Sequence, residues 1–389
     1  MKEWKNDISK ERLIAWRRYM HQNPELSFQE EKTSQFVYDT LQSFGGLELS
    51  RPTPYSVVAI VRGRRPGKTI GMRADMDALP IREENKTDYA SRVPGVMHAC
   101  GHDGHTAILL GTAEILAKHK ENLAGEVRFF FQHAEEQYPG GGEEMVQAGV
   151  MDGVDVVIGL HLMSGLETGK IGIVYGPMMA APDVFEIKIQ GKGGHAAHPQ
   201  ETVDPIVIGA QIITNLQHIV SRRTGAFEQR VVSVTQFQGG TADNIIPDTA
   251  ELLGTVRCFD EALRKDAEQK IEQIVKGITE AHGASYSYRY RYGYRPVINE
   301  DSVTRIVEQS AVELFGKEAV AYIPPSMGGE DFSAFLQKAK GCFFKLGSGN
   351  TQKETTYPHH HPRFDIDEDA LVIGAQMFLQ IADNLLKPE

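Results

Sequence analysis

Apolar residues in the first part of the chain switch between helical and strand spacing. From Glu11 to Phe44 they recur at helical spacing, interrupted at Asn23-Pro24. Short apolar runs predict buried strands at residues 56–61, 69–73, 126–132 and 154–160. Residues 106–119 and 143–148 predict helices between them. Because strands that alternate with helices build parallel sheets, we expect an α/β fold with a mostly parallel sheet that is covered on both faces.

The pattern changes near residue 180, where strictly alternating strands replace the continuous apolar runs. Such alternation is typical of antiparallel strands with one solvated face. The predicted order is strand, helix, strand, strand, helix, strand, over residues 184–189, 205–220, 231–237, 249–258, 260–282 and 284–294. This order is the split βαβ, ferredoxin-like pattern of an α+β domain. Helix and strand character resumes near residue 297 and ends in a helix over 368–386.

Two domains follow from this pattern. A catalytic α/β domain is expected from residues 1–181 and 297–389, with the smaller α+β domain inserted at 182–296. The length of 389 residues supports the division, because it exceeds one ordinary core.

Composition and charge exclude several classes of protein. Hydrophobic residues make up 41% and charged residues 24%, which is typical of globular chains. The net charge of -11 argues against a nucleic acid or an anionic membrane as partner. The N-terminal segment lacks the apolar region of a signal peptide. Three widely spaced cysteines do not form the framework of a secreted disulfide protein, so we expect a cytoplasmic protein.

The densest group of reactive side chains lies in residues 97–105, with the sequence MHACGHDGH. Its candidate ligands are His98, Cys100, His102, Asp103 and His105. Thiolate, imidazole and carboxylate groups bind zinc-like cations, and loops after parallel strands are where such sheets place their sites. One histidine here would indicate a helix cap or a surface residue, but five candidate ligands in one loop favour a metal site.

Three further segments place metal-binding side chains at predicted strand ends: Glu135-Glu136, His161 and the histidine triplet around His360. Two adjacent carboxylates can have different roles, since one can bind a metal while the other takes a proton from water. Each segment alone is also compatible with a solvated surface. Together they form a constellation of first-row metal ligands.

The inserted region carries another possible set of binding residues, His195, Asn244 and Arg257. An imidazole, an amide and a guanidinium can bind the carbonyl and the carboxylate of a ligand through hydrogen bonds. Turn chemistry and a surface charge explain the same residues equally well.

Taken together, these motifs resemble the metallopeptidase-like amidohydrolases. That family includes hippurate hydrolases, bacterial N-acyl-amino-acid deacylases and plant auxin-conjugate hydrolases, with aminoacylase and carboxypeptidase G as more distant relatives. The resemblance covers nearly the whole chain. The matching segments are 17–30 (RRYMHQNPELSFQE), 73–80 (RADMDALP), 97–105, 131–136 (FQHAEE), 191–205, 244–257 (NIIPDTAELLGTVR), 328–332 (GGEDF) and 360–367 (HHPRFDID).

The resemblance implies a centre of two divalent metal ions. Cys100 would bridge the ions, and the other ligands would be His102, Glu136, His161 and His360. Zinc suits the thiolate, and manganese, cobalt or nickel suit the carboxylate-rich remainder. Glu135 would be the general acid/base and Asp75 the carboxylate that orients the centre.

The same resemblance assigns roles to the inserted domain, which would serve as a lid and dimerisation domain. His195 resembles a lid histidine that reaches the substrate carbonyl, in relatives often from the neighbouring subunit. Asn244 and Arg257 resemble the pair that contacts the substrate. A homodimer or a higher homo-oligomer is therefore expected.

Two departures from the family pattern affect the site. Residues 137–139 separate the two glutamates from the glycines that usually follow them directly. His359 and His361 can each compete with His360 for the metal, although Pro362 and Phe364 have the family's spacing only if His360 is the ligand.

The activity implied is hydrolysis of the amide bond of N-acyl amino acids. A carboxypeptidase or dipeptidase would use the same centre and stays open as an alternative. A zinc-dependent deaminase would carry His-x-Glu with a later Pro-Cys-x-x-Cys, which the sequence lacks. A non-enzymatic metal-binding protein would not need Glu135 beside the ligand Glu136.

Overall fold

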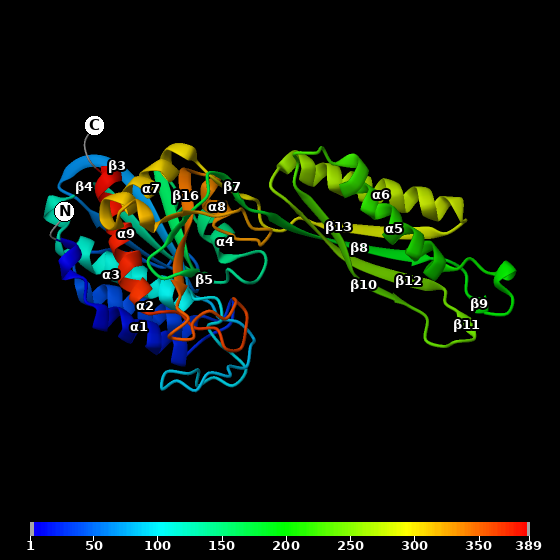
Figure 1. Cartoon of the computed structure of the whole chain (residues 1–389), viewed down its shortest axis with the longest axis horizontal. Coiled ribbons are helices and arrows are strands. Elements are labelled where there is room, and N and C mark those ends of the chain that lie inside the picture. The colour runs from blue at the N-terminus through cyan, green and yellow to red at the C-terminus, as the bar shows by residue number, and fades with distance from the viewer. Residues whose placement is uncertain (1–3, 387–389) are drawn as a thin grey trace. The chain divides into compact units, whose positions relative to one another are not determined.

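The computed structural model describes residues 4–386 and divides them into two compact units (Figure 1). Unit 1 holds the residues up to Met178, Ile298–Pro325 and the residues from Asp331 onward. Unit 2 holds Met179–Val297 and Ser326–Glu330. Unit 1 is therefore built from both ends of the chain.

The described part of unit 1 contains an eight-stranded sheet in the order β1-β2-β4-β3-β5-β16-β6-β15. Its strands are β1 (Glu48–Ser50), β2 (Val57–Arg62), β3 (Arg65–Asp75), β4 (Ala124–Gln132), β5 (Val156–Glu167), β6 (Ile171–Ile173), β15 (Val320–Tyr322) and β16 (Lys340–Gly349). The central strands β4, β3, β5 and β16 are parallel, whereas β1 and β2 form an antiparallel edge. The predicted mostly parallel sheet is confirmed.

Helices cover both faces of this sheet. One face packs against α1 (Lys10–Gln22), α2 (Glu31–Phe44), α3 (His102–Lys118), α7 (Asp301–Phe315) and α9 (Asp369–Leu386). The helix α3 is buried along nearly its whole length, which explains why it is apolar on all sides. The other face carries the short helices α4 (Gly141–Gln147) and α8 (Ser333–Leu336). There the ring of Phe130 in β4 stacks on Phe335 of α8.

The alternation of side chains along β3 and β5 decides which residues can meet. In β3, Met72 and Ala74 belong to the main apolar core, so Arg73 and Asp75 point to the opposite face. In β5, Leu160 and Leu162 lie in that core, so His161 points the same way as Asp75. Since β3 and β5 are neighbours in the sheet, polar residues gather on one face near their carboxyl ends.

Two expected element boundaries are wrong. The strand with His161 was expected to end there, but β5 continues to Glu167 because it pairs with β16 beyond that point. The helix expected from Thr106 begins at His102, directly after Gly101, whose φ of 92° is left-handed.

Unit 2 contains an antiparallel four-stranded sheet in the order β10-β12-β8-β13 within its described residues. These strands are β8 (Ala181–Gln190), β10 (Arg230–Gly239), β12 (Thr249–Cys258) and β13 (Ser285–Arg291). The helices α5 (Pro205–Arg223) and α6 (Glu261–Ala281) pack on one face (Figure 1). Their sequence order confirms the predicted split βαβ pattern. Unit 2 also contains the short pair of β9 (Gly194–His195) with β11 (Ile245–Ile246). The last pair, β7 (Gly176–Met179) with β14 (Val297–Asn299), lies at the two unit boundaries in the sequence.

A buried charge network anchors the first helix. Arg17 in α1 is fully buried and donates to Asp103 (2.8 Å) and Asp365 (2.6 Å). His21, one turn further, lies 2.8 Å from Asp103 through Nδ1 and 3.2 Å from Glu83 through Nε2. Burial and Arg17 act to lower the pKa of His21, but the two carboxylates outweigh them and raise it to about 9.

Among residues 4–386, no helix is long and apolar enough to span a membrane. The three cysteines are buried and form no disulfide with one another.

Candidate metal centre

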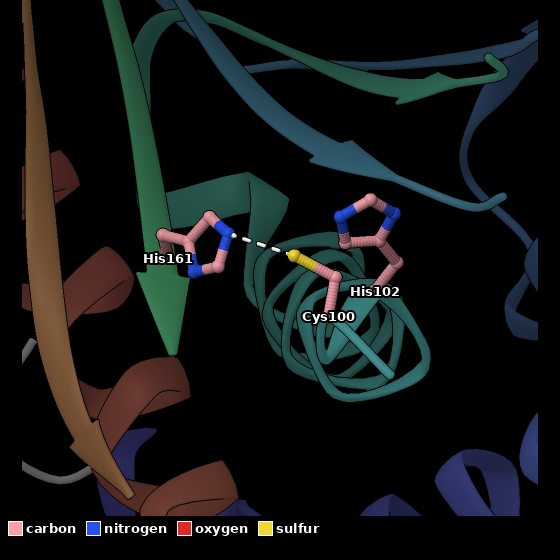
Figure 2. A group of neighbouring side chains, drawn as sticks. All are labelled: Cys100, His102 and His161. Carbon is pink, nitrogen blue, oxygen red and sulfur yellow. Dashed lines mark hydrogen bonds between the residues drawn. The ribbon is translucent and has the colours of Figure 1, made fainter. Parts of the chain in front are cut away.

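The predicted ligands converge in unit 1 from loops and strands that are far apart in the sequence. Cys100, His102 and His161 have ligand atoms within 4.8 Å of one another (Figure 2). The same spacing holds for two further sets, Cys100 with Glu136 and His360, and His102 with Glu135 and Glu136. Cys100, His102 and Glu136 therefore each belong to two of these three overlapping groups, as residues between two neighbouring ions would.

Both buried histidines present a ring nitrogen to this centre. His161 donates from Nδ1 to the carbonyl oxygen of Leu162 (2.6 Å), so its Nε2 keeps a lone pair 3.5 Å from Cys100 Sγ. His102 contacts Asp77 through Nδ1, at 2.9 Å from the carbonyl and 3.1 Å from the carboxylate. Its Nε2 is buried and has no hydrogen-bond partner among the described residues. A buried orphan nitrogen is costly, and a bound cation would satisfy it.

Asp75 is the ionised carboxylate beneath the centre. It accepts from His105 Nδ1 (2.6 Å) and Arg73 (2.6 Å), and one oxygen lies 3.8 Å from His102 Nε2. Burial acts to raise its pKa, but the charge of Arg73 and the two histidines outweigh burial, so the pKa of Asp75 lies well below its usual range. His105 also accepts from the Leu162 amide (2.9 Å), which fixes its neutral tautomer.

Asp77 links the two glutamates to the histidine loop. One of its oxygens contacts His102, and the other accepts from the backbone of Glu136 (3.0 Å). Ala134, just before the glutamates, has a left-handed φ of 49° and donates to Glu30 (2.7 Å). The carboxylate of Glu135 is buried with its residue 7% exposed, and it lies in one ligand group with His102 and Glu136.

Of the three C-terminal histidines, His360 lies next to Glu136. His360 has a φ of 65° and donates its backbone amide to Ala99 (2.8 Å). Its Nε2 lies 3.1 Å from Glu136 Oε1. Cys100 and Glu136 raise the pKa of His360 to about 10. A carboxylate that attracts an imidazolium in this way also suits a metal cation.

His359 reaches the same thiol from another side. Its Nδ1 lies 3.8 Å from Cys100 Sγ, and its ring lies 5.1 Å from that of His161. Burial and nearby positive charge lower its pKa to about 3, so it is neutral and able to bind a metal. His361 instead stacks on Tyr357 at 4.8 Å. The structure thus brings two of the three candidates to Cys100.

The residues predicted to bind substrate all lie in unit 2. His195 and Asn244 are neighbours, since the amide of Ala196 donates to the carbonyl of Asn244 (3.0 Å). Both are exposed. Arg257 lies in β12 and contacts the hydroxyl of Thr255 and the carbonyl of Asp183. The structure therefore places His195 in β9, Asn244 directly before β11 and Arg257 in the four-stranded sheet.

A comparison with protein families identifies the chain. Residues 71–384 match the family described as peptidase family M20/M25/M40. This chain belongs to that family. It is 67% identical to the N-acyl-L-amino acid amidohydrolase of Geobacillus stearothermophilus over 76% of this chain and 80% of that protein. It is 43% identical to thermostable carboxypeptidase 2 of Saccharolobus solfataricus over 95% of both.

Solved structures of the M20 family agree with the fold. The Bacillus subtilis YXEP protein, described as a dinuclear metal-binding peptidase, superposes with a TM-score of 0.85 at 37% identity. The match covers 97% of this chain and 98% of that one. The predicted resemblance to metal-dependent amidohydrolases is confirmed at the level of the family.

Two residues of the centre were not singled out from the sequence: Arg73, which contacts Asp75, and Asp77, which contacts His102. A signal for both of them was present. In the segment RADMD, the polar residues 73, 75 and 77 alternate with apolar ones, which places them on one face of a strand and its extension.

Proposed function

We propose that this protein is a metal-dependent amidohydrolase that cleaves the amide bond of N-acyl amino acids. The observation that carries the proposal is the convergence of Cys100, His102, Glu136, His161 and His360, with Glu135 beside them. The 67% identical relative named as an N-acyl-L-amino acid amidohydrolase supports this substrate class.

Two divalent ions fit the side chains present. The thiol of Cys100 would be one of the ligands, because it lies in two of the overlapping ligand groups, as His102 and Glu136 also do. His102, Glu136, His161 and His360 would supply the remaining ligands. A thiolate favours zinc, and imidazoles and carboxylates also accept manganese, cobalt or nickel. The relative described as a dinuclear metal-binding peptidase supports the number of ions.

The proposed reaction needs both the metal ions and the carboxylate of Glu135. When bound, divalent ions would lower the pKa of water to near 7 and would polarise a carbonyl oxygen. Glu135 takes the proton of the attacking water and later returns it to the departing amine nitrogen. Asp75 keeps its negative charge next to His102 and His105 and so holds these rings in orientation.

Unit 2 supplies the proposed substrate contacts. His195 would donate to the substrate carbonyl, and Asn244 and Arg257 would bind its other polar groups, because all three side chains offer N–H donors. We further propose that this unit, corresponding to the inserted domain at 182–296, acts as a lid and dimerisation domain. A cytoplasmic homodimer acting on small molecules is the expected state.

A carboxypeptidase is the second candidate, because a relative with that name is 43% identical over 95% of the chain. Both activities use the same centre, so a substrate panel decides between them. Faster hydrolysis of N-acetyl or N-benzoyl amino acids than of matched dipeptides and N-blocked dipeptides supports the deacylase. The opposite order supports the peptidase.

Metal removal should abolish the activity. After dialysis against EDTA, we expect no hydrolysis, because Glu135 alone cannot make water sufficiently acidic at neutral pH. Zinc, manganese, cobalt or nickel should then restore the rate, and metal analysis should find two ions per chain. Hydrolysis that persists in metal-free protein would contradict the proposal.

Single substitutions should show whether His360 or His359 is the metal ligand. His360→Ala is expected to weaken binding of one ion by at least about tenfold, since loss even of groups that support a ligand costs about 10- to 100-fold. Bound metal per chain after equilibrium dialysis is the measurement. His361→Ala is the matched control, because its ring stacks on Tyr357. Metal loss in His359→Ala but not in His360→Ala would reassign the ligand.

A further inference from the structure

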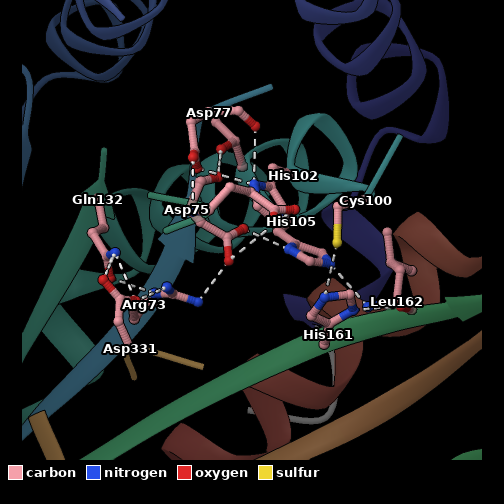
Figure 3. Close-up of polar contacts among 12 residues, drawn as sticks. Arg73, Asp75, Asp77, Cys100, His102, His105, Gln132, His161, Leu162 and Asp331 are labelled. Carbon is pink, nitrogen blue, oxygen red and sulfur yellow. Dashed lines mark hydrogen bonds and ion pairs between the residues drawn. The ribbon is translucent and has the colours of Figure 1, made fainter. Parts of the chain in front are cut away.

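Asp331 contacts Arg73 and Gln132 in a buried polar network of unit 1 (Figure 3). Its residue is 1% exposed. The carboxylate accepts from Arg73 (2.8 Å), from Gln132 Nε2 (2.8 and 2.7 Å) and from the backbone amide of Gly142 (2.9 Å). Three separate segments of unit 1 therefore depend on one side chain.

Two of these contacts enclose the loop that carries the proposed base. Gln132 is the last residue of β4, and Gly142 lies in the first turn of α4. Glu135 and Glu136 lie between them in the sequence. Asp331 thus holds both ends of the loop from which the two glutamates project.

The fit around this loop is tight. A Cβ atom on Gly142 would lie 2.9 Å from the Asp331 backbone oxygen and 3.0 Å from its carboxylate. Both distances are shorter than ordinary contacts allow, so position 142 accepts only glycine without a shift. The backbone amide can approach the carboxylate closely for this reason.

The third contact leads to the metal centre through Arg73. Its guanidinium is fully buried and uses three nitrogens on three partners: Nε on Gln132 (2.8 Å), one terminal nitrogen on Asp331 and the other on Asp75 (2.6 Å). A planar guanidinium fixes the directions of its donors, so Asp331 sets where Arg73 presents its charge to Asp75. Asp75 in turn contacts His105 and lies near His102.

We propose that Asp331 is a positioning residue of the metal centre, which aligns Asp75 through Arg73 and the Glu135-Glu136 loop through Gln132 and Gly142. A carboxylate suits this place, because its hydrogen-bond partners Arg73, Gln132 and the Gly142 amide are all N–H donors. An asparagine would turn an NH2 group toward one of them. The kinetic part of this inference rests on the proposed function, whereas the metal-binding part does not.

The test is Asp331→Asn in the full chain. We expect affinity for Co²⁺, measured by titration of the metal-free protein, to fall about 10- to 100-fold. The thiolate-to-cobalt absorption of Cys100 should shift or weaken, because the ligands lose their alignment. On an N-acyl amino acid, kcat should fall by a similar factor with KM nearly unchanged, since the substrate contacts are untouched.

Glu126→Gln is the matched control. Glu126 is a buried carboxylate at the other end of β4, paired with Arg62 and Arg128. The Glu126→Gln substitution should lower the stability of the protein and leave the cobalt affinity, the cobalt spectrum and kcat unchanged. Wild-type values of all three in a folded Asp331→Asn variant would overturn the inference.

A second variant covers the case in which Asp331→Asn does not fold. Gln132→Met keeps the Arg73–Asp331 pair and removes the contacts at the start of the glutamate loop. We expect a smaller drop in cobalt affinity and kcat, and unchanged values would contradict the role of Asp331 in holding this loop. If the wild type binds two ions but hydrolyses no N-acyl amino acid, the proposed function fails while the cobalt measurements still decide this inference.

Discussion

Glu135→Gln is expected to reduce kcat by about 10²- to 10⁴-fold, the range that general acid–base groups typically contribute. Glutamine keeps the length of the side chain but cannot accept the proton of water or return it to the amine. Both ions should stay bound, because the proposed ligands are unchanged. Steady-state kinetics and metal analysis of the same preparation provide the measurement.

The neighbouring Glu143→Gln is the control for this substitution. Glu143 is exposed in α4, where it contacts Gln147. It carries the same charge on the far side of the glycine turn, so its loss should leave kcat unchanged. If Glu135→Gln kept near-normal turnover with both ions present, another group would have to be the base.

Arg17→Met should destabilise unit 1 by about 3–5 kcal/mol, the usual cost of removing one partner from a buried ion pair. Methionine fills a similar volume but leaves Asp103 and Asp365 buried without their cation. Urea unfolding followed by tryptophan fluorescence measures the change in the free energy of unfolding. The two tryptophans, Trp4 and Trp16, both lie in unit 1, so the signal reports on that unit.

Lys10→Met, on the same helix, is the comparison for Arg17. Lys10 pairs with Asp369 at the surface, where both side chains are more than 40% exposed, at 49% and 44%. Exposed pairs contribute about 0–1 kcal/mol, so the midpoint should hardly move. A similar loss of unfolding free energy in both variants would show that burial does not determine how much the ion pairs of Arg17 stabilise unit 1.

The sequence predicted most of the elements because their periodicity is local. The strict alternation before Gln190 and the amphipathic stretch after Pro205 correspond to β8 and α5. His161 illustrates the limit, since its strand continues because of pairing with β16, far away in the sequence. Pairing with a strand that is distant in the sequence does not change the local pattern of apolar residues, so the sequence cannot reveal it.

The site was predictable where one loop collects several ligand types, as around Cys100. Asp331 and Arg17 were not, because a single charged residue looks the same in a sequence whether it is solvated or buried in a network. Their partners are distant: Arg73 and Asp331 differ by 258 positions. The choice between His359 and His360 also depends on a backbone turn at a φ of 65°, which the repeated histidines do not reveal.

The order of the strands in unit 1 has a consequence during synthesis. β16 lies between β5 and β6, so the sheet lacks an inner strand until that late segment has been made. Roughly 170 residues separate the end of β5 from the start of β16, which corresponds to about 10–30 s of translation at typical rates. During this time the apolar edge of β5 has no neighbour on that side and can pair with other chains. Newly made chains are therefore most prone to aggregate before residue 349 leaves the ribosome, whereas every residue of unit 2 has been synthesised by then.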